Sequence, residues 1–136
     1  MTDLVTNQDR DFALSCIRAG AVLMLLGVVL GAFGAHALQQ ALTSRQLASY
    51  QTGVLYQQLH SLALILVGIV ALVTPATRWL PRAAVLFGAG IFFFSGSIYA
   101  MTLGAPRWLG MVAPVGGVSF MLAWLAVALH ARKGRR

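Results

Sequence analysis

Four long stretches of apolar residues alternate with short polar segments along this chain. They cover about residues 19–38, 54–73, 83–103 and 109–130. A helix needs about 20 mostly apolar residues to cross the hydrocarbon core of a bilayer. The stretches are continuous, whereas the strands of a membrane barrel alternate between apolar and polar residues. We therefore predict an all-α protein, a four-helix transmembrane bundle that forms a single integral membrane domain over residues 1–136.

The polar segment between the first and second stretches is longer than the other two loops. It reads LQQALTSRQLASYQTG, and Leu38, Leu42, Leu47 and Tyr50 recur in it among polar residues. Such a mixture of apolar and polar residues is typical of a short amphipathic helix. We therefore predict a short amphipathic helix between spans 1 and 2, lying on the membrane surface.

Composition supports a membrane location and excludes a soluble domain. Of the 136 residues, 59% are hydrophobic and 10% are charged, against about 25% charged residues in soluble domains. The net charge of +7 does not indicate a nucleic-acid partner, because the basic residues lie at the ends of the apolar stretches, as membrane topology requires. Cys16 is the single cysteine, which excludes an intramolecular disulfide and a cysteine metal site.

The basic residues also predict the orientation in the membrane. Only Arg45 and Arg107 lie on the side of the first and third loops, whereas basic residues concentrate on the side of the termini. Cytoplasmic loops carry the excess of Lys and Arg, so we expect both termini in the cytoplasm. We also expect His130 and the basic C-terminus to face anionic lipid headgroups. Eight basic residues share the side of the termini: Arg10, Arg18, Arg78, Arg82, Arg132, Lys133, Arg135 and Arg136.

The end of the first stretch, GAFGAHAL, allows two interpretations. Ala35-His36-Ala37 resembles the small-residue site at which signal peptides are cleaved. However, the apolar stretch is longer than the usual 7–15-residue core of a signal peptide, and Asp3, Asp9 and Asp11 precede it. We therefore expect this stretch to be retained as the first membrane span.

Glycines form a stripe along the first span. Small residues let helix backbones approach closely in lipid. Two interpretations stay open: the stripe packs within the bundle, or it forms a contact between two copies in a homo-oligomer. His36 lies on the opposite face of the helix. The stripe consists of Gly20, Gly27, Gly31 and Gly34.

Polar and helix-perturbing residues concentrate in the half of the bundle farther from the termini. Thr52, Tyr56 and His60 share one face of the second span, and Ser95 and Tyr99 share one face of the third. Polar side chains in a membrane usually face the bundle interior or a cavity. We therefore predict a small polar pocket in this outer half, lined by His36, Thr52, Tyr56, His60, Ser95, Tyr99, Pro114, Gly116 and Gly117.

The chemistry available to such a pocket is limited. His60 and its neighbours either bind a ligand or merely satisfy one another by hydrogen bonds between helices. His36 and His60 are two histidines without a third ligand nearby in the sequence, so we expect no metal and no haem. No Asp or Glu occurs in any of the four spans, and no Ser or Cys has both a base and an acidic partner. We therefore expect no enzymatic activity.

Four motifs resemble those of a known family. GAFGAHAL, YQTGVLYQQLHSLAL, FFSGSIYAMTL and APVGGVSFMLAW occur in this order, and together they resemble the YgdD-like family of small four-span bacterial inner-membrane proteins. A mitochondrial transmembrane family of eukaryotes is similar. The resemblance implies an inner-membrane protein with a retained first helix, and it implies no activity or cofactor. The recurrent positions of the family are Gly31, Gly34, His36, Thr52, Tyr56, His60, Gly96, Tyr99, Pro114, Gly116 and Trp124.

Two functions follow as hypotheses. In the first, the protein binds or moves a small or lipid-like molecule through the polar pocket, without catalysis. In the alternative, it is a structural or assembly protein of the membrane. Its glycine stripe and amphipathic segment would then contact partners, and the polar residues would only lock the bundle together.

Overall fold

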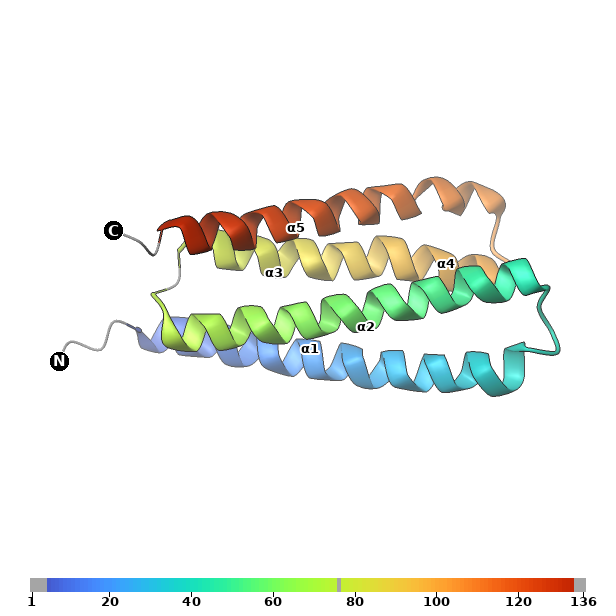
Figure 1. The fold of residues 1–136 in the computed structure, drawn as a ribbon, viewed down its shortest axis with the longest axis horizontal. Coiled ribbons are helices and arrows are strands. Elements are labelled where there is room, and N and C mark those ends of the chain that lie inside the picture. Colours follow the sequence, from blue (N-terminus) through green and yellow to red (C-terminus); the bar gives the residue numbers. More distant parts are fainter. Residues whose placement is uncertain (1–4, 76, 134–136) are drawn as a thin grey trace.

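The computed structural model describes residues 5–75 and 77–133, and almost all of them are helical (Figure 1). Four long helical segments run side by side, and two of them contain a short π-helical turn. The elements are α1 (Asn7–Phe33), η1 (Gly34–Leu38), α2 (Ser44–Val73), α3 (Trp79–Gly90), η2 (Ile91–Ser95), α4 (Gly96–Thr102), η3 (Arg107–Met111) and α5 (Ala113–Lys133).

These segments have the length and composition of membrane spans. Asn7–Leu38, Ser44–Val73, Trp79–Thr102 and Arg107–Arg132 are each apolar enough to cross a bilayer. No strand occurs in the part of the chain that the structure describes. The predicted all-α transmembrane bundle is therefore confirmed.

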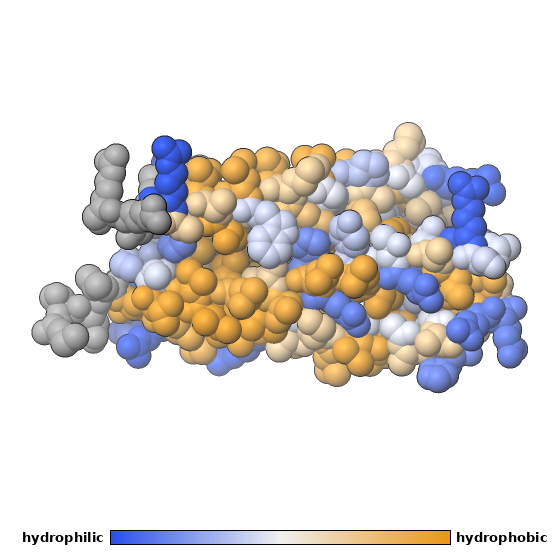
Figure 2. All heavy atoms as spheres, viewed as in Figure 1, coloured by the Kyte–Doolittle hydropathy of each residue, from blue (hydrophilic) through white to orange (hydrophobic). Residues whose placement is uncertain are grey.

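The outer surface is apolar in the way that lipid requires. Leu25, Val85, Phe92 and Met121 are each 63–72% exposed, and such side chains would be costly in water. In Figure 2 a broad hydrophobic band covers the half of the visible face nearest the termini. Hydrophilic residues extend from the other end toward the middle of that face. On this face the polar residues are therefore concentrated in the half farther from the termini, as the sequence pattern indicates.

The helices form two antiparallel pairs. α1 packs along α2, α3 packs along α5, and α2 joins the pairs through η2, α3 and α4. Figure 1 shows that both termini lie at one end, which we call the terminal end. The loops that follow η1 and α4 lie at the opposite end, called the loop end below. α2 thereby becomes the central helix, with different neighbours on its two sides.

The segment between the first two spans differs from the prediction. It forms no separate amphipathic helix, because residues 44–53 are the beginning of α2. The start of α2 is fixed by a capping box in which the Thr43 hydroxyl accepts the Gln46 N–H, and the Gln46 side chain accepts the Thr43 N–H at 3.0 Å. Because the helix begins at this cap, α2 starts about ten residues before the predicted start of the second span, toward the loop end.

The glycine stripe of α1 faces α2. Gly20, Gly27 and Gly34 are buried. A Cβ atom on Gly20 would lie 2.7 Å from the carbonyl oxygen of Ser61, and one on Gly27 would lie 2.9 Å from Gln58 Cγ. The stripe therefore lets α1 and α2 approach closely. Since α2 occupies this face, a second copy of the chain has no access to it.

The terminal half of the bundle contains a dry apolar core. Leu80 and Phe87 of α3 are almost fully buried, together with Ala71 of α2 and Ala123 of α5. Small residues on facing helices let these large side chains fill the interior without voids. This core holds the two helix pairs together.

Candidate functional site

Two consecutive residues of α2 face different neighbours. Tyr56 and Gln57 are about 100° apart around the helix axis. Gln57 is buried toward α1 and α4, whereas Tyr56 faces Phe94 and Phe120. The polar residues of α2 therefore belong to two separate sites, one on each side of the helix.

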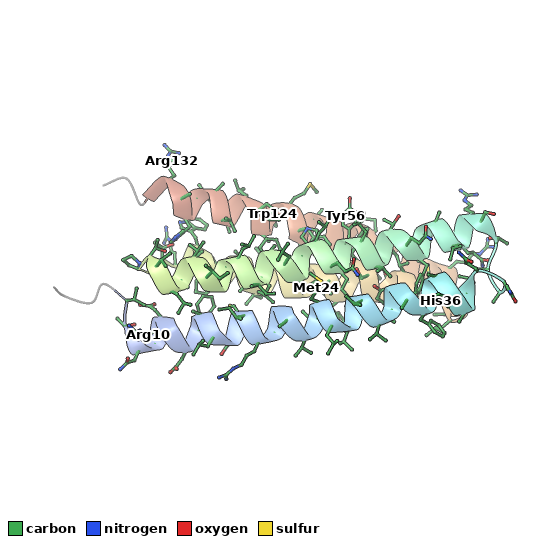
Figure 3. All side chains as sticks on the ribbon, turned by 60° about the horizontal axis from the view of Figure 1, so that its bottom comes forward. Arg10, Met24, His36, Tyr56, Trp124 and Arg132 are labelled. Atoms are coloured by element: carbon green, nitrogen blue, oxygen red, sulfur yellow. The ribbon has the colours of Figure 1, made fainter. Side chains whose placement is uncertain are left out.

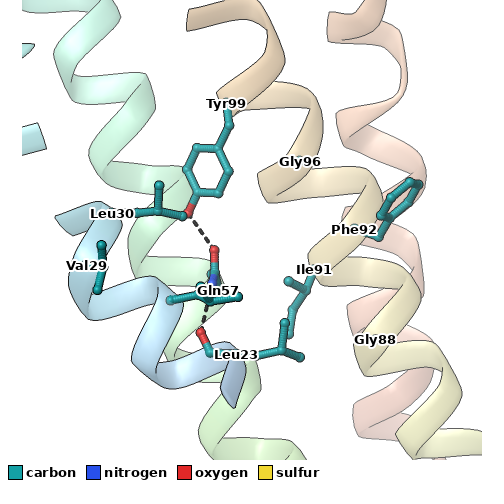
Figure 4. A pocket seen from close by; sticks show the side chains of 10 residues that line it. Leu23, Val29, Leu30, Gln57, Gly88, Ile91, Phe92, Gly96 and Tyr99 are labelled. Carbon is teal, nitrogen blue, oxygen red and sulfur yellow. Dashed lines mark hydrogen bonds between the residues drawn. The ribbon is translucent and has the colours of Figure 1, made fainter. Parts of the chain in front are cut away.

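The first site is a hydrogen-bond chain across three helices (Figure 4). The Tyr99 hydroxyl on α4 donates to Oε1 of Gln57 at 2.8 Å. Nε2 of Gln57 donates to the carbonyl oxygen of Leu23 on α1, also at 2.8 Å. One amide N–H of Gln57 remains without a partner in the described part of the chain, because an amide nitrogen carries two hydrogens.

Tyr50 supports this chain from the loop end. Its hydroxyl donates to the carbonyl oxygen of Leu30 at 2.7 Å, and its ring lies 5.4 Å from that of Tyr99. The ring also fills the space beside Gly34, where a Cβ atom would collide with it. Two tyrosines from different helices thus hold α1 and α4 against α2.

A groove of about 480 Å³ lies beside Gln57 and Tyr99, between α1 and the third span. Its remaining lining is apolar or glycine. Ligand sites typically combine such an apolar lining with a few polar groups, in volumes of about 300–1,000 Å³. Figure 4 shows Gln57 and Tyr99 among the residues that surround the groove. The other lining residues are Leu23, Leu26, Val29, Leu30, Gly88, Ile91, Phe92 and Gly96.

The second site is an aromatic cluster around His60. The imidazole lies flat on the ring of Phe120, with centroids 3.5 Å apart and planes 9° from parallel. Tyr56 and Trp124 approach the same imidazole at 5.7 Å and 6.2 Å. Figure 3 shows Tyr56 and Trp124 on the side where α2 and α5 meet. This cluster connects the two helix pairs.

The hydrogen bond of His60 determines its tautomer. Nδ1 lies 2.7 Å from the carbonyl oxygen of Tyr56, and a carbonyl only accepts, so Nδ1 carries the proton in the neutral ring. Nε2 is then an acceptor, and it has no hydrogen-bond partner among the described residues. The side chain of His60 is only 6% exposed. His60 therefore packs as an aromatic residue and keeps one unused acceptor.

Ser95 and Gly116 hold helices together and offer nothing to a ligand. The Ser95 hydroxyl is fully buried and donates to the carbonyl oxygen of Gly53 at 2.7 Å. Gly116 lies so close to the third span that a Cβ atom would be 2.7 Å from the Cβ of Phe94. Both residues belong to the close contacts that surround the π-helical turn η2.

The other predicted pocket residues lie apart from these two sites. His36 is exposed in η1, near the loop end and away from Tyr56 (Figure 3). The exposed Thr52 donates its hydroxyl to the carbonyl of Ala48. Pro114 is exposed, and Gly117 has open space where a Cβ would lie. The structure thus brings Tyr56 together with His60 and places Tyr99 in the groove, but it does not gather all nine residues in one pocket.

His130 differs from its prediction. It is buried at the terminal end, where its two ring nitrogens lie 3.2 Å from Thr74 Oγ1 and 2.9 Å from Thr77 Oγ1. The expectation that His130 faces lipid headgroups is therefore wrong, because both nitrogens are used to join α5 to the α2–α3 loop. The expectation for the rest of the basic C-terminus stays a prediction, and residues 134–136 lie outside the described residues.

No metal-binding group of three or more His, Cys, Asp or Glu side chains occurs within residues 5–75 and 77–133. The expectations of no metal, no haem and no catalysis stay predictions. His36 is exposed near the loop end and His60 is buried in α2, so the structure does not place the two histidines together.

The residue that sequence reasoning missed is Gln57. The predicted pocket did not include it, although it is buried and links three helices. A signal for it exists in the sequence: Tyr50, Gly53 and Gln57 recur at i, i+3 and i+7, which is one face of a helix. Tyr56 and His60 define another face of the same helix, so the pattern alone does not decide which of the two faces is buried.

Comparison with known proteins decides the family. Residues 30–117, more than half of the chain, match the family described as "Protein of unknown function (DUF423)". The chain belongs to this family. Its description states no activity, and no solved structure matches the chain.

Named relatives of this family cover most of the chain. The UPF0382 membrane protein YwdK of Bacillus subtilis (strain 168) is 38% identical over 114 residues, which are 84% of this chain and 93% of the relative. The UPF0382 inner membrane protein YgdD of Escherichia coli (strain K12) is 35% identical over 116 residues, 85% of this chain and 88% of the relative. The resemblance to the YgdD-like family is thereby confirmed. Together with the four apolar helices, these relatives make the chain an integral membrane protein.

Proposed function

We propose that this protein binds a lipid-like molecule in the groove beside Gln57 and Tyr99, without catalysing a reaction. The observation that carries the proposal is the composition of this groove: apolar side chains from two spans, with one buried amide and one hydroxyl at its polar side. An alkyl chain fits the apolar part. The free amide N–H of Gln57 would donate to a carbonyl or hydroxyl oxygen of the ligand.

The location of the groove supports access from the membrane. α1 packs on α2, and the groove lies between α1 and the third span. A ligand therefore reaches the groove sideways from the bilayer, without opening the bundle. Burying an alkyl chain there gains packing contacts rather than hydrophobic free energy, because lipid tails are equally apolar. Selectivity must then come from Gln57 and Tyr99.

The alternative function as an assembly protein has lost its main supports. The glycine stripe, which would contact partners in this alternative, is covered by α2. The segment expected to lie on the membrane as an amphipathic helix is part of α2. The proposal of ligand binding does not depend on either feature.

The experiment fills the groove without disturbing the helix packing. Gly96 lines the groove and has no atom within 4 Å of the place where a Cβ would lie, so Gly96→Leu should fold and occupy the ligand's space. We expect a bacterial lipid extract to raise the melting temperature of the purified wild-type protein in detergent, and to leave that of Gly96→Leu unchanged.

Gly117→Leu is the matched control. Gly117 is equally open and does not line the groove, so this variant should keep the stabilisation by lipid. If the lipid extract stabilises all three proteins equally, or none of them, the groove is not a ligand site.

We also propose that the protein lies in the bacterial inner membrane with both termini in the cytoplasm. The support is the distribution of eight basic residues against two in the sequence, and the name of the Escherichia coli relative as an inner membrane protein. Alkaline phosphatase fused after Arg136 should be inactive, and green fluorescent protein fused there should fluoresce. The opposite pattern would reverse the proposed orientation.

A further inference from the structure

Two arginines that are far apart in the sequence line one pocket at the loop end. Arg45 lies in the first turn of α2, and Arg107 begins η3 after the third span. Both line a pocket of about 540 Å³ between the beginning of α2 and the end of α4. They are also the only Lys or Arg residues that the sequence places on this side of the membrane. The pocket therefore contains all the Lys and Arg charge of this side.

Neither arginine has an acidic partner among the described residues. The acidic residues of the chain are Asp3, Asp9 and Asp11, and no Asp or Glu follows them. Asp9 and Asp11 lie in the first turns of α1 at the terminal end, whereas Asp3 is outside the described residues. Neither the Arg45 nor the Arg107 side chain makes a hydrogen bond or ion pair within residues 5–75 and 77–133. Two like charges in one pocket repel each other unless an anion lies between them.

The position of Arg45 adds to this excess of positive charge in the pocket. The N-terminal end of a helix carries partial positive charge, so cations are favoured at the C-terminal end instead. Arg45 is the second residue of α2, two positions after the N-cap Thr43. An anion in the pocket would compensate both the guanidinium groups and this end of the helix.

The other polar groups of the pocket are mainly donors. Ser49 has a hydroxyl without a hydrogen bond in the described part of the chain. Oε1 of Gln46 accepts from Thr43, and its amide N–H groups have no partner in the described part of the chain. The Thr102 hydroxyl donates to the carbonyl of Ile98, so its oxygen can still accept. Such a set of donors matches the oxygen atoms of a phosphate, which arginine binds through two parallel hydrogen bonds.

We propose that this pocket binds a phosphate group, with Arg45 and Arg107 as its two cationic ligands. Such a group comes from one of two sources: the headgroup of an anionic phospholipid or free phosphate. Trp108 follows Arg107 and is 59% exposed, which is typical of a residue at the level of the lipid headgroups. The proposal is independent of the groove, because the two sites share no lining residue.

Met101 gives a local test, because it lines the pocket. The probes are dihexanoyl phosphatidylglycerol and inorganic phosphate, each added to the full-length protein in a neutral detergent. The readout is the ¹³C-methyl NMR signal of Met101, assigned by Met101→Leu, with Met24 of α1 as the distant reference. We expect one or both probes to shift the Met101 signal in a saturable way that sodium chloride at equal ionic strength does not reproduce.

Arg45→Gln/Arg107→Gln should weaken this binding by at least about tenfold. Arg78→Gln/Arg82→Gln removes the same charge at the terminal end and should leave it unchanged. Both arginines of the pocket are exposed, so the variant should keep its fold, which circular dichroism checks. Saturation by phosphatidylglycerol alone identifies a lipid headgroup, and saturation by inorganic phosphate identifies free phosphate.

Two results would overturn the proposal. One is a Met101 signal that neither probe shifts beyond the effect of sodium chloride. The other is equal affinity of the wild type and Arg45→Gln/Arg107→Gln. Since Gly96→Leu leaves this pocket intact, its binding should match the wild type, and failure of the groove proposal would not affect this measurement.

Discussion

The hydroxyl of Tyr99 donates a 2.8 Å hydrogen bond to the side-chain oxygen of Gln57. This bond joins α4 to α2, and Gln57 extends the connection to α1 through the carbonyl of Leu23. It therefore links the two helix pairs beside a groove that is otherwise apolar. The same pair has two functions in our account: it fixes the position of α1 and supplies the polar side of the groove.

The first prediction concerns the strength of this link. Hydrogen bonds between membrane helices contribute about 1 kcal/mol each. Tyr99→Phe should lower the unfolding free energy by about this amount, and Gln57→Leu by about 2 kcal/mol, because Gln57 makes two such bonds. A double-mutant cycle in mixed micelles should give a coupling free energy of about 1 kcal/mol between the two residues. Additive losses would mean that the bond does not form in the membrane protein.

The second prediction separates packing from hydrogen bonding at His60. Because the imidazole stacks on Phe120, His60→Phe preserves an aromatic ring and should change the unfolding free energy by less than about 1.5 kcal/mol. His60→Ala removes the ring and should cost about 3 kcal/mol. Thermal unfolding in detergent measures both variants. If His60→Phe is as damaging as His60→Ala, then the ring nitrogens and not the stacking on Phe120 make the essential interaction.

The third prediction uses two adjacent glycines of α5. A Cβ atom at Gly116 would lie 2.7 Å from Phe94 Cβ, whereas one at Gly117 would meet nothing within 4 Å. Gly116→Ala should therefore separate α5 from the third span and cost about 2 kcal/mol. Gly117→Ala should be neutral or slightly stabilising, because alanine favours the helix. Equal melting temperatures for the two variants would contradict the close contact of α5 with the third span.

The fourth prediction concerns the terminal end. The Thr74 hydroxyl donates to the carbonyl of Val70, so it can only accept from Nε2–H of His130, and Nδ1 then accepts from Thr77. His130→Ala removes both bonds and should make the α2–α3 loop more sensitive to limited proteolysis. Arg132→Gln, at an exposed position of the same helix, is the control. Unchanged cleavage in His130→Ala would show that the loop does not depend on this contact.

The hydrophobic pattern was sufficient to predict the four spans and the alternation of the loops between the two ends of the bundle. It was also sufficient for the glycine face of α1 and the shared faces of Tyr56 with His60 and of Ser95 with Tyr99. These features depend on length and on the periodicity of a single helix.

Contacts between helices could not be predicted in the same way. The rotation of each helix about its axis decides whether Tyr56 or Gln57 faces α1, and both arrangements satisfy the periodicity. Two π-helical turns, at Gly34–Leu38 and Ile91–Ser95, also change the register of the helices in which they occur. His130 illustrates a third cause: its partners are 53 and 56 residues away in the sequence.

The most direct test of the central claim, that the groove holds a lipid-like molecule, is mass spectrometry of the protein after gentle extraction from bacterial membranes. The account predicts one class of amphiphile retained by the wild type and by Gly117→Leu, and lost from Gly96→Leu. Retention of the same amphiphile by Gly96→Leu, or the absence of any bound amphiphile in the wild type, would contradict it.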